Sequence, residues 1–282
     1  MKVVISAESA VDLSPELLKE YNIKTTPFTI LLGDDARLDG DVTPSEIIEF
    51  VKSTNVLPKT SAVNQFQFEE HFSEILKDAD AIVHFSISSE MSSAYSNAVE
   101  AAKNFKNVYV IDSRSLSTGI GLLVLYAAKL AQKGASVEEI VSSVLKRIPF
   151  VQASFVPSRL DYLYKGGRCS SLVYFAANVF QIKPQIMVKD GKMTSGKKYR
   201  GRYESVIVKY VKETLEEFSN PDLEEVFITY TTASSEIVNE IKQVLIERGF
   251  KNIRETIAGG TVTSHCGEGT LGVLFINDGL NN

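Results

Sequence analysis

Hydroxyl side chains are concentrated in one short segment of this sequence. Six serines lie between positions 86 and 96, where an apolar strand-like run ends and a helical pattern begins. Hydroxyl groups and the unpaired N–H groups at the start of a helix attract anions, because these donors converge there and the helix dipole favours negative charge. Helix capping needs only one of these serines. The segment therefore predicts either an anion site or a simple cap.

Two further sets of hydrogen-bonding side chains could join such a site. Thr60 and Ser61 end a polar loop before another helical pattern, and in a doubly wound sheet both segments can lie at the carboxyl edge, where ligands bind. His265 lies in a glycine-flanked segment predicted to be a loop, and its imidazole can donate to a carboxylate in either tautomer. His71 falls on an amphipathic helix and His84 in an apolar strand, so both are expected to be core histidines with local partners.

Two glycine-containing motifs resemble nucleotide sites but lack what those sites need. Residues 267–272 match G-x-G-x-x-G, yet an apolar strand follows where a dinucleotide site requires a helix and a later acidic residue. Residues 191–198 approximate a phosphate loop, but Lys198 replaces the Ser or Thr that holds Mg²⁺, and the surroundings predict a hairpin. No histidine or cysteine pair has metal-ligand spacing. The sequence therefore predicts no nucleotide cofactor and no metal.

Basic side chains gather in two places. Residues 160–166 predict a short helix that ends at Gly166-Gly167, and Arg168 at that corner suits bidentate contact with a carboxylate or phosphate. A longer run is typical of a solvated face, although it could dock an acidic partner or a phosphate. This run contains one acid, Asp190, and the basic residues Lys189, Lys192, Lys197, Lys198, Arg200 and Arg202.

A serine hydrolase is the alternative enzymatic interpretation. The chain has many serines and a histidine in a glycine-flanked segment, but no G-x-S-x-G elbow. Ser–His arrangements on other folds are recognised by geometry and not by sequence. A Ser/His-dependent lipid or ester hydrolase therefore stays open as a second function.

The elements that must position these residues follow an α/β pattern in the first half of the chain. Short β-branched runs alternate with longer amphipathic stretches, which predicts a parallel sheet flanked by helices. Ser14 and Thr43 have the sequence signatures of helix starts. The predicted strands cover 3–6, 26–32, 81–87 and 108–112, and later helices cover 115–133 and 137–147.

The second half begins with a strand-like run at 151–156. It continues with an Asp190-Gly191 hairpin, two helix–strand units and a final apolar strand at 272–276. This order predicts a mixed or antiparallel α/β sandwich. We therefore predict two domains, residues 1–150 and 151–282.

Composition sets further bounds on function. The 282 residues include 30 Lys and Arg against 35 Asp and Glu, a formal charge of −5, which argues against general nucleic-acid binding. Two cysteines provide no disulfide framework and fit a reducing compartment. The N-terminus lacks the apolar core of a signal peptide, and the longest apolar run, 119–128, falls short of the ~20 residues that span a bilayer. A soluble, cytoplasmic protein is expected, with a monomer slightly favoured.

In order and spacing, six short motifs resemble the DegV family over essentially the whole chain. They are Thr60-Ser61, the Ser-x-x-Met-Ser92 junction, Ile111-Asp112-Ser113, Tyr162-Leu163-x-x-Gly-Gly-Arg168, Lys183-Pro184 before Asp190-Gly191, and His265-x-Gly-x-Gly.

The resemblance implies a two-domain α/β protein that binds one long-chain fatty acid, with the tail buried and the carboxylate between the domains. Such a protein is the non-catalytic subunit of bacterial fatty acid kinase. It presents the carboxylate to a separate ATP-binding subunit that makes acyl phosphate for phospholipid synthesis. Transient contact with a membrane is a further expectation for a protein that exchanges lipid. No cofactor is implied.

By the same resemblance, two groups of residues correspond to functional positions. The carboxylate would be held by Thr60, Ser61, Ser92, Ser93 and His265. The head-group opening and partner surface would involve Gly167, Arg168, Arg200 and Arg202.

Three positions depart from the family pattern. Glu8-Ser9 replaces Asp-Ser, Ala62-Val63 replaces Gln-Pro, and Ser92-Ser93-Ala94 replaces Ser-Gly-Thr. Without the glycine at position 93, the backbone is expected to approach the head group differently.

Overall fold

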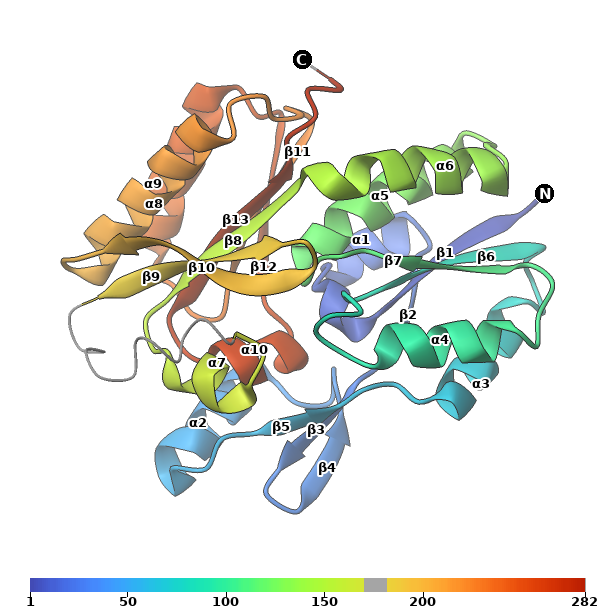
Figure 1. Cartoon of the computed structure of the whole chain (residues 1–282), viewed down its shortest axis with the longest axis horizontal. Coiled ribbons are helices and arrows are strands. Elements are labelled where there is room, and N and C mark those ends of the chain that lie inside the picture. The colour runs from blue at the N-terminus through green and yellow to red at the C-terminus, as the bar shows by residue number, and fades with distance from the viewer. Residues whose placement is uncertain (170–181, 282) are drawn as a thin grey trace.

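A four-stranded parallel sheet, ordered β2-β1-β6-β7, forms the centre of the first half of the chain in a computed structural model that describes residues 1–169 and 182–281 (Figure 1). Each neighbouring pair of strands is parallel, as strands joined through helices require. The predicted parallel sheet flanked by helices is confirmed. Its strands are β1 (Val3–Glu8), β2 (Lys24–Thr26), β6 (Ala81–Ser86) and β7 (Val108–Asp112).

The helices of this half begin largely where local signals place them. Ser14 Oγ accepts the Leu17 N–H at 3.3 Å, and Thr43 and Glu46 form a reciprocal capping box. The predicted helix at 115–133 begins later, at Thr118, because Arg114 and Ser117 have positive φ angles of 51° and 52°, which a right-handed helix cannot contain. The elements are η1 (Ser9–Val11), α1 (Pro15–Glu20), α2 (Pro44–Thr54), α3 (Gln65–Ile75), α4 (Ala94–Ala102), α5 (Thr118–Gln132), α6 (Val137–Arg147) and η2 (Ile148–Phe150).

The prediction of a single strand at 26–32 is wrong. Strand β2 ends at Thr26, and Pro27, which lacks an N–H for a sheet ladder, separates it from β3 (Thr29–Leu32). Strand β3 leaves the parallel sheet and pairs antiparallel with β4 (Asp35–Leu38) and β5 (Lys59–Ser61). Thr60 and Ser61 therefore lie on a strand of a small separate sheet, and not in a loop.

The second half forms a six-stranded mixed sheet with the order β10-β9-β8-β13-β11-β12. Strands β11 and β12 pair parallel and the other neighbours antiparallel, so the predicted mixed sheet is confirmed. The β9–β10 hairpin turns at Asp190-Gly191, whose φ angles of 51° and 78° match a type I′ turn. The strands are β8 (Val151–Pro157), β9 (Lys183–Lys189), β10 (Lys192–Tyr199), β11 (Glu225–Tyr230), β12 (Asn252–Ile257) and β13 (Thr270–Ile276).

Helices cover both faces of this sheet. Helices α8 (Tyr203–Glu217) and α9 (Ser235–Arg248) pack on one face around Tyr210, while α5 of the first half packs on the other. The short helix α10 (Gly260–Cys266) contacts β3 and β5 of the three-stranded sheet formed by β4, β3 and β5, and a second short helix, α7 (Asp161–Gly166), packs against α10 (Figure 1). Within the described ranges, every helix is too short or too polar to cross a bilayer.

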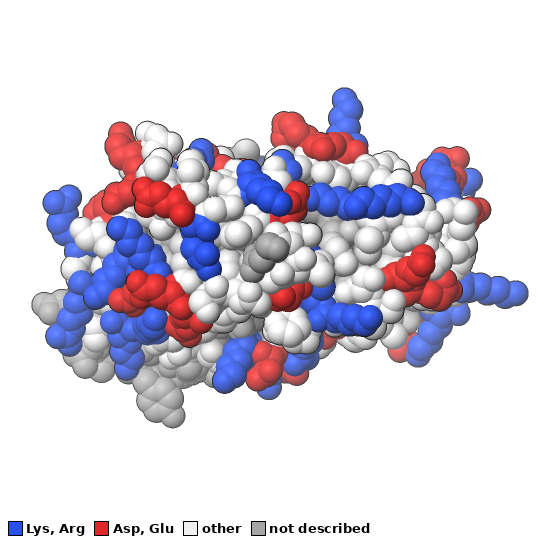
Figure 2. Space-filling view, turned by 90° about the horizontal axis from the view of Figure 1, so that it is seen from above, with Lys and Arg blue, Asp and Glu red and all other residues white. Residues whose placement is uncertain are grey.

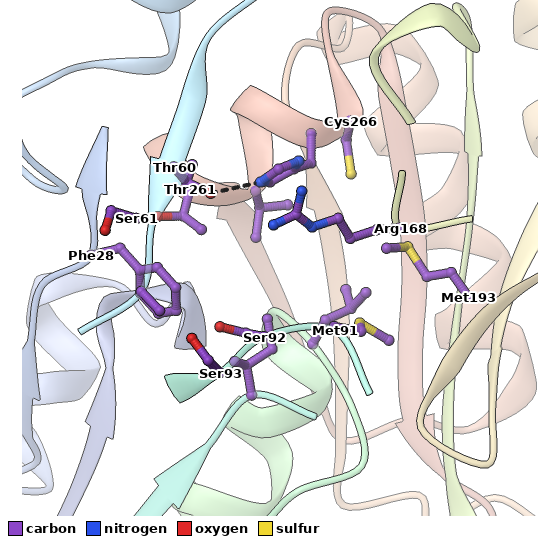
Figure 3. A pocket seen from close by; sticks show the side chains of 15 residues that line it. Phe28, Thr60, Ser61, Met91, Ser92, Ser93, Arg168, Met193, Thr261 and Cys266 are labelled. Atoms are coloured by element: carbon purple, nitrogen blue, oxygen red, sulfur yellow. Dashed lines mark hydrogen bonds between the residues drawn. The ribbon is translucent and has the colours of Figure 1, made fainter. Parts of the chain in front are cut away.

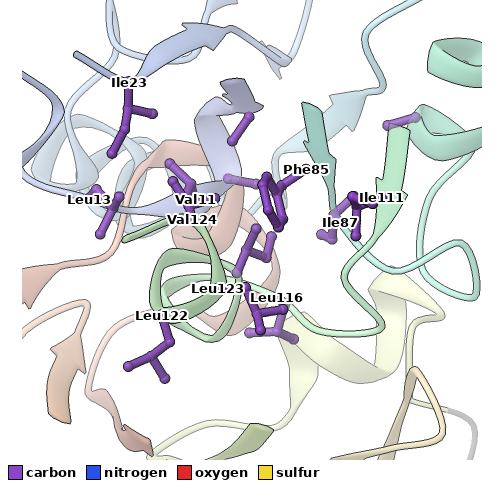
Figure 4. Close-up of a cluster of buried hydrophobic side chains, with 14 of the residues drawn as sticks. Val11, Leu13, Ile23, Phe85, Ile87, Ile111, Leu116, Leu122, Leu123 and Val124 are labelled. Atoms are coloured by element: carbon purple, nitrogen blue, oxygen red, sulfur yellow. The ribbon is translucent and has the colours of Figure 1, made fainter. Parts of the chain in front are cut away.

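Helix α5 joins the two halves. Its apolar side chains pack with Phe85 and Leu13 of the first half (Figure 4), and it also contacts β8, β11 and β13 of the second. Gly121 permits this close packing, because a Cβ there would lie 2.8 Å from Leu13 Cδ2. One apolar core therefore crosses the predicted domain boundary at 150/151, and the boundary itself stays a prediction.

Charged side chains of both signs are interspersed on the face shown in Figure 2. The basic run that begins at Lys189 is partly neutralised by neighbouring acids. Lys192 pairs with Glu90 at 3.2 Å, and Lys197 pairs with Glu217 at 3.0 Å. Part of the run is therefore ion-paired, with Glu90 between β6 and α4 and with Glu217 on α8.

Candidate functional site

A pocket of about 270 Å³ lies between the three-stranded sheet, the serine-rich segment at residues 86–96, and α10 (Figure 3). Figure 3 shows hydroxyl side chains from β5 and from the serine-rich segment around one space, with the Arg168 guanidinium reaching toward it. The structure thus brings together most of the sequence-predicted site. The residues that line the pocket include Thr60, Ser61, Ser92, Ser93, Arg168 and His265.

A hydrogen bond joins the two most distant of these residues. Thr60 Oγ1 and His265 Nε2 are 2.8 Å apart, although 205 positions separate them in the chain. Burial, aided by the nearby Arg168 charge, lowers the pKa of His265 to about 4. The imidazole is therefore neutral at pH 7. With its hydrogen on Nε2 it donates to Thr60, which leaves the threonine O–H free to donate to an anion.

His265 lies on helix α10, so the prediction of a glycine-flanked loop is wrong. Gly260 is the first residue of this helix, and a left-handed Gly267, with φ of 74°, follows its end. Positions four apart share a helix face. Thr261 and His265 therefore line the pocket together, and so do their neighbours Val262 and Cys266.

The Gly166-Gly167-Arg168 corner meets this imidazole from the other side. A Cβ at Gly166 would lie 3.1 Å from His265 Nδ1, so the missing side chain permits close approach. Gly167 adopts the left-handed conformation that ends α7, with φ of 70°, as the sequence predicts. Gly167 does not line the pocket, but the turn that it makes directs Arg168 toward it.

Most of the six serines have structural partners. Ser86 donates to Glu8 Oε1 at 2.6 Å, Ser88 to the Gly191 carbonyl at 2.7 Å, and Ser89 to Asp112 at 2.6 Å. These contacts fix the segment between the first sheet and the hairpin. Two pocket-lining hydroxyls remain, those of Ser92 and Ser93.

The Ser92 hydroxyl can cap a helix and bind an anion at the same time. Its oxygen accepts the Ala94 N–H at 3.2 Å, so its own O–H remains available to donate. Ser93, at the N-cap position of α4, makes no side-chain capping bond. The two alternatives predicted for this segment are therefore compatible.

The rest of the pocket wall is mainly apolar. A second, smaller cavity of about 20 Å³ is also bordered by Leu116, Val262 and Cys266. Burial raises the pKa of the Cys266 thiol to about 12, which keeps this wall uncharged. Sequence reasoning did not single out the apolar lining residues Phe28, Ile87, Met91, Leu116, Met193 and Val262.

Arg200 and Arg202 do not line this pocket. The Arg202 side chain is 89% exposed and lies 3.9 Å from Glu204 at the start of α8. Their assignment to the head-group opening and partner surface therefore stays a prediction.

Serine–histidine contacts do occur, but in the core. Ser6 Oγ lies 2.9 Å from His84 Nδ1 and 2.7 Å from His71 Nε2, and Glu8 Oε1 lies 3.5 Å from His84 Nε2. Ser6, Glu8 and His84 are at most 1% exposed, so a substrate could not reach this set. In the pocket, the described partner of His265 is a threonine. The hydrolase alternative is therefore not supported.

The core position of His71 predicts an acid-sensitive contribution to stability. Burial, with the nearby His84, lowers the pKa of His71 to about 3, against about 6.5 when unfolded. Its neutral form therefore stabilises the fold above pH 6.5, and this contribution is lost as pH falls from 6.5 toward 3. Urea unfolding at pH 7.5 and pH 4.5 measures how much free energy of unfolding each protein loses on acidification. We expect this loss to be roughly 1–2 kcal/mol smaller in His71→Gln than in the unchanged protein. Equal losses would contradict this account.

Metal-ligating side chains do not cluster in the part of the chain that the structure describes. Among residues 1–169 and 182–281, no three His, Cys, Asp or Glu side chains form a metal-binding group. The chemistry of the pocket is instead that of neutral hydroxyl and imidazole donors above an apolar wall, with one guanidinium beside them. Such a site suits an anionic head group on an apolar body.

Known proteins resemble this chain over nearly its full length. The family model described as an uncharacterised protein of the DegV family matches residues 2–278. A DegV domain-containing protein of Caldanaerobacter subterraneus is 32% identical over 280 residues, covering 97% of this chain and 98% of that protein. One from Clostridium acetobutylicum is 31% identical and covers 98% of each.

Solved structures have the same fold. A DegV lipid-binding protein from Thermotoga maritima is 26% identical with a TM-score of 0.84, and the alignment covers 98% of both chains. A second T. maritima protein, whose structure revealed a fatty acid binding function, is 26% identical with a TM-score of 0.84, covering 98% of this chain and 99% of that one. The fatty-acid-binding DegV protein of Thermus thermophilus, at 23% identity and a TM-score of 0.91, shows the fold over 98% of this chain and 99% of its own. By sequence and by architecture, this chain belongs to the DegV family.

Proposed function

We propose that this chain binds a long-chain fatty acid, with the carboxylate at Thr60, Ser92 and His265 and the tail against the apolar wall. The observation that carries the proposal is that neutral donors from β5, the serine-rich segment and α10 line the same pocket as several apolar side chains, with Arg168 beside them. DegV relatives from T. maritima and T. thermophilus bind lipid or fatty acid, which supports the same ligand class here.

The division of the pocket matches the energetics of such a ligand. Burial of each CH₂ contributes about 0.8 kcal/mol, so an apolar wall is enough to hold the tail. A carboxylate removed from water without partners would cost several kcal/mol or become protonated. Fixed hydroxyl and imidazole donors avoid that cost, and they leave the carboxylate oxygen more nucleophilic than a buried arginine pair would.

The same carboxylate would be presented to a separate ATP-binding kinase subunit, which transfers phosphate to it and forms acyl phosphate. A groove of about 410 Å³ lies on the other side of the Thr60–His265 contact and shares Thr60, Arg168 and His265 with the pocket. Lys59 and Lys165 also line this groove. Arg168, Lys59 and Lys165 together would supply three positive charges to stabilise a transferring phosphoryl group. Because ATP is the donor, the pair would act in the cytoplasm, with transient membrane contact when lipid is exchanged.

Mass spectrometry of the purified, denatured protein tests the ligand directly. A co-purifying fatty acid near one per chain is expected, and delipidated protein should take up added oleate to the same ratio. Ser92→Ala should retain less fatty acid, because it removes one O–H donor while leaving the wall intact. A protein that neither carries nor takes up fatty acid would contradict the proposal.

Replacement of Arg168 should separate lipid binding from phosphoryl transfer. With a cognate kinase subunit, Arg168→Ala is expected to slow acyl-phosphate formation by about tenfold or more, because a positive charge is lost where charge spreads onto the transferring group. Fatty-acid affinity should change little. Arg159→Ala is the matched control, since Arg159 precedes the start of α7, pairs there with Asp161, and lines neither cavity. Weaker fatty-acid binding with unchanged transfer would contradict the role assigned to Arg168.

A further inference from the structure

Helix α10 begins without a capping side chain of its own. Its N-cap residue is Gly259, which has no hydroxyl or carboxylate to accept the first N–H groups of the helix. Free N–H groups at a helix start need partners, above all where the chain is buried. Gly260 and Thr261 are buried, so acceptors must come from elsewhere in the chain.

Two carboxylates from the distant N-terminal segment supply these acceptors. Asp12 Oδ1 accepts the Gly259 N–H at 2.8 Å. Asp39 Oδ1 accepts the Gly260 N–H at 3.0 Å, and Asp39 Oδ2 accepts the Thr261 N–H at 3.3 Å. Three consecutive N–H groups therefore end on two acidic side chains more than 220 positions away in sequence.

Both carboxylates are themselves fixed in place. Ser117 donates to Asp12 Oδ2 at 2.5 Å, and Ser9 donates to Asp39 Oδ2 at 2.8 Å. Burial raises the pKa of Asp12 to about 7, although the hydrogen bonds from Ser117 and Gly259 favour its ionised form. Asp39 accepts two of the three helix N–H groups, so its replacement is the more informative test.

The Gly259-Gly260 pair permits this contact. A Cβ at Gly259 would lie 2.9 Å from Asp12 Oδ1, and one at Gly260 would lie 2.8 Å from Asp39 Oδ1 and 2.3 Å from Ile30 Cδ1. Side chains here would push the start of α10 away from the carboxylates and from β3. The two glycines therefore allow the start of α10 to lie in close contact with Asp12, Asp39 and Ile30 of the N-terminal half.

The three-stranded sheet thus holds α10 at both ends. Asp39 directly follows β4 and holds the first turn of the helix, while Thr60 on β5 holds its last turn through His265. A shift of the first turn would carry the imidazole with it, because one short helix contains both. Thr261 and His265 lie on the pocket-facing side of that helix.

We propose that Asp12 and Asp39 are positioning residues, which fix helix α10 so that the His265 imidazole meets the head group of the bound ligand. The inference rests on the proposed function in that the ligand is taken to be a fatty acid. Neither carboxylate lines the pocket, and each acts through the backbone of the helix.

Histidine NMR on the ligand-free protein tests the positioning directly. The chain has three histidines, so ¹⁵N-histidine labelling with His71→Gln as an assignment aid gives a readable spectrum. Asp39→Ala is expected to shift the His265 ring signals, and Asp39→Asn, which keeps one acceptor oxygen, to shift them less. Asp222→Asn is the matched control, because Asp222 is a buried carboxylate that binds Arg147 and does not line the pocket. It should leave the His265 signals unchanged.

Affinity for oleate then tests the consequence. Asp39→Ala should weaken binding by about tenfold, and Asp222→Asn by less than twofold even where it lowers the melting temperature as much. In a His265→Ala background, Asp39→Ala should weaken oleate binding little further, because the residue through which Asp39 acts is already missing. Unshifted His265 signals, or an Asp39→Ala penalty that persists fully without His265, would overturn the inference. Failure of the unchanged protein to bind oleate would instead count against the proposed function, and the NMR result would still decide the positioning.

Discussion

Replacement of His265 by Ala is expected to weaken fatty-acid binding by roughly 10- to 100-fold. A hydrogen bond to a charged group contributes about 1.5–3 kcal/mol, and each 1.4 kcal/mol is a factor of ten in the dissociation constant. The change also removes the partner of Thr60 Oγ1, 2.8 Å away, so a second donor loses its orientation. Titration of delipidated protein with a fluorescent fatty acid, displaced by oleate, measures the effect.

Two companion variants make this result interpretable. His265→Asn retains an amide donor and should recover part of the affinity. His71→Gln removes a histidine from the core on α3, outside the pocket lining, and should leave the dissociation constant within about twofold. An Ala variant that binds oleate as tightly as the unchanged protein would remove His265 from the head-group site.

Replacement of Arg147 by Met is expected to cost about 3–5 kcal/mol of folding stability, because it leaves buried carboxylates without their counter-charge. Arg147 Nε lies 2.6 Å from Asp278 Oδ2, and its Nη2 lies 2.5 Å from Asp222 Oδ2. The Arg147 and Asp222 side chains are 6% and 8% exposed. Burial alone would raise the pKa of Asp222, but its hydrogen bonds, led by that from Arg147, hold the pKa below its usual range.

Urea unfolding at pH 7 measures this loss. Lys146→Met, at an exposed position on the same helix, is the control and should stay within about 0.5 kcal/mol of the unchanged protein. The stability loss of Arg147→Lys should lie between those of Lys146→Met and Arg147→Met, since an ammonium group cannot reproduce the planar contacts to both carboxylates. A loss below about 1 kcal/mol in Arg147→Met would show that the carboxylates find other partners or solvent.

Local signals predicted the features whose causes are local. The Thr43–Glu46 capping box and the Asp190-Gly191 turn depend on a few neighbouring residues, and both form as expected. Helix α6 at 137–147 also has the predicted bounds, because its cap and its apolar spacing lie within one short stretch. Propensity, capping and turn chemistry are sufficient in such segments.

Features decided by distant contacts escaped sequence analysis. Helix α10 is short and glycine-flanked, and its first N–H groups bond to Asp12 and Asp39, which no local pattern connects to it. The strand identity of Thr60 depends likewise on pairing with Ile30 across the small sheet. A proline at position 27 could have indicated the break between β2 and β3, since proline cannot continue a ladder.

For the site, residue types and family resemblance indicated the polar end better than the apolar wall. Hydroxyls, a histidine and an arginine are few enough to single out, and the structure places Thr60, Ser92, Arg168 and His265 around one pocket. Apolar residues such as Phe28 and Met193 are too common to stand out, and their place in the wall depends on three-dimensional packing. Arg202, assigned by the resemblance to the head-group opening and partner surface, lies at the exposed start of α8, outside the pocket lining.

The contacts around α10 join residues that are far apart in sequence, and this separation affects when the site can form during synthesis of the chain. Thr60 and His265 are 205 positions apart, and Asp12 and Gly259 are 247 positions apart. A ribosome releases the N-terminal segment first, so most of the apolar lining exists in the nascent chain before the imidazole has been synthesised. If the pocket binds lipid as proposed, binding must wait until translation is nearly complete, and a truncated translation product would expose apolar surface without the imidazole that completes the site.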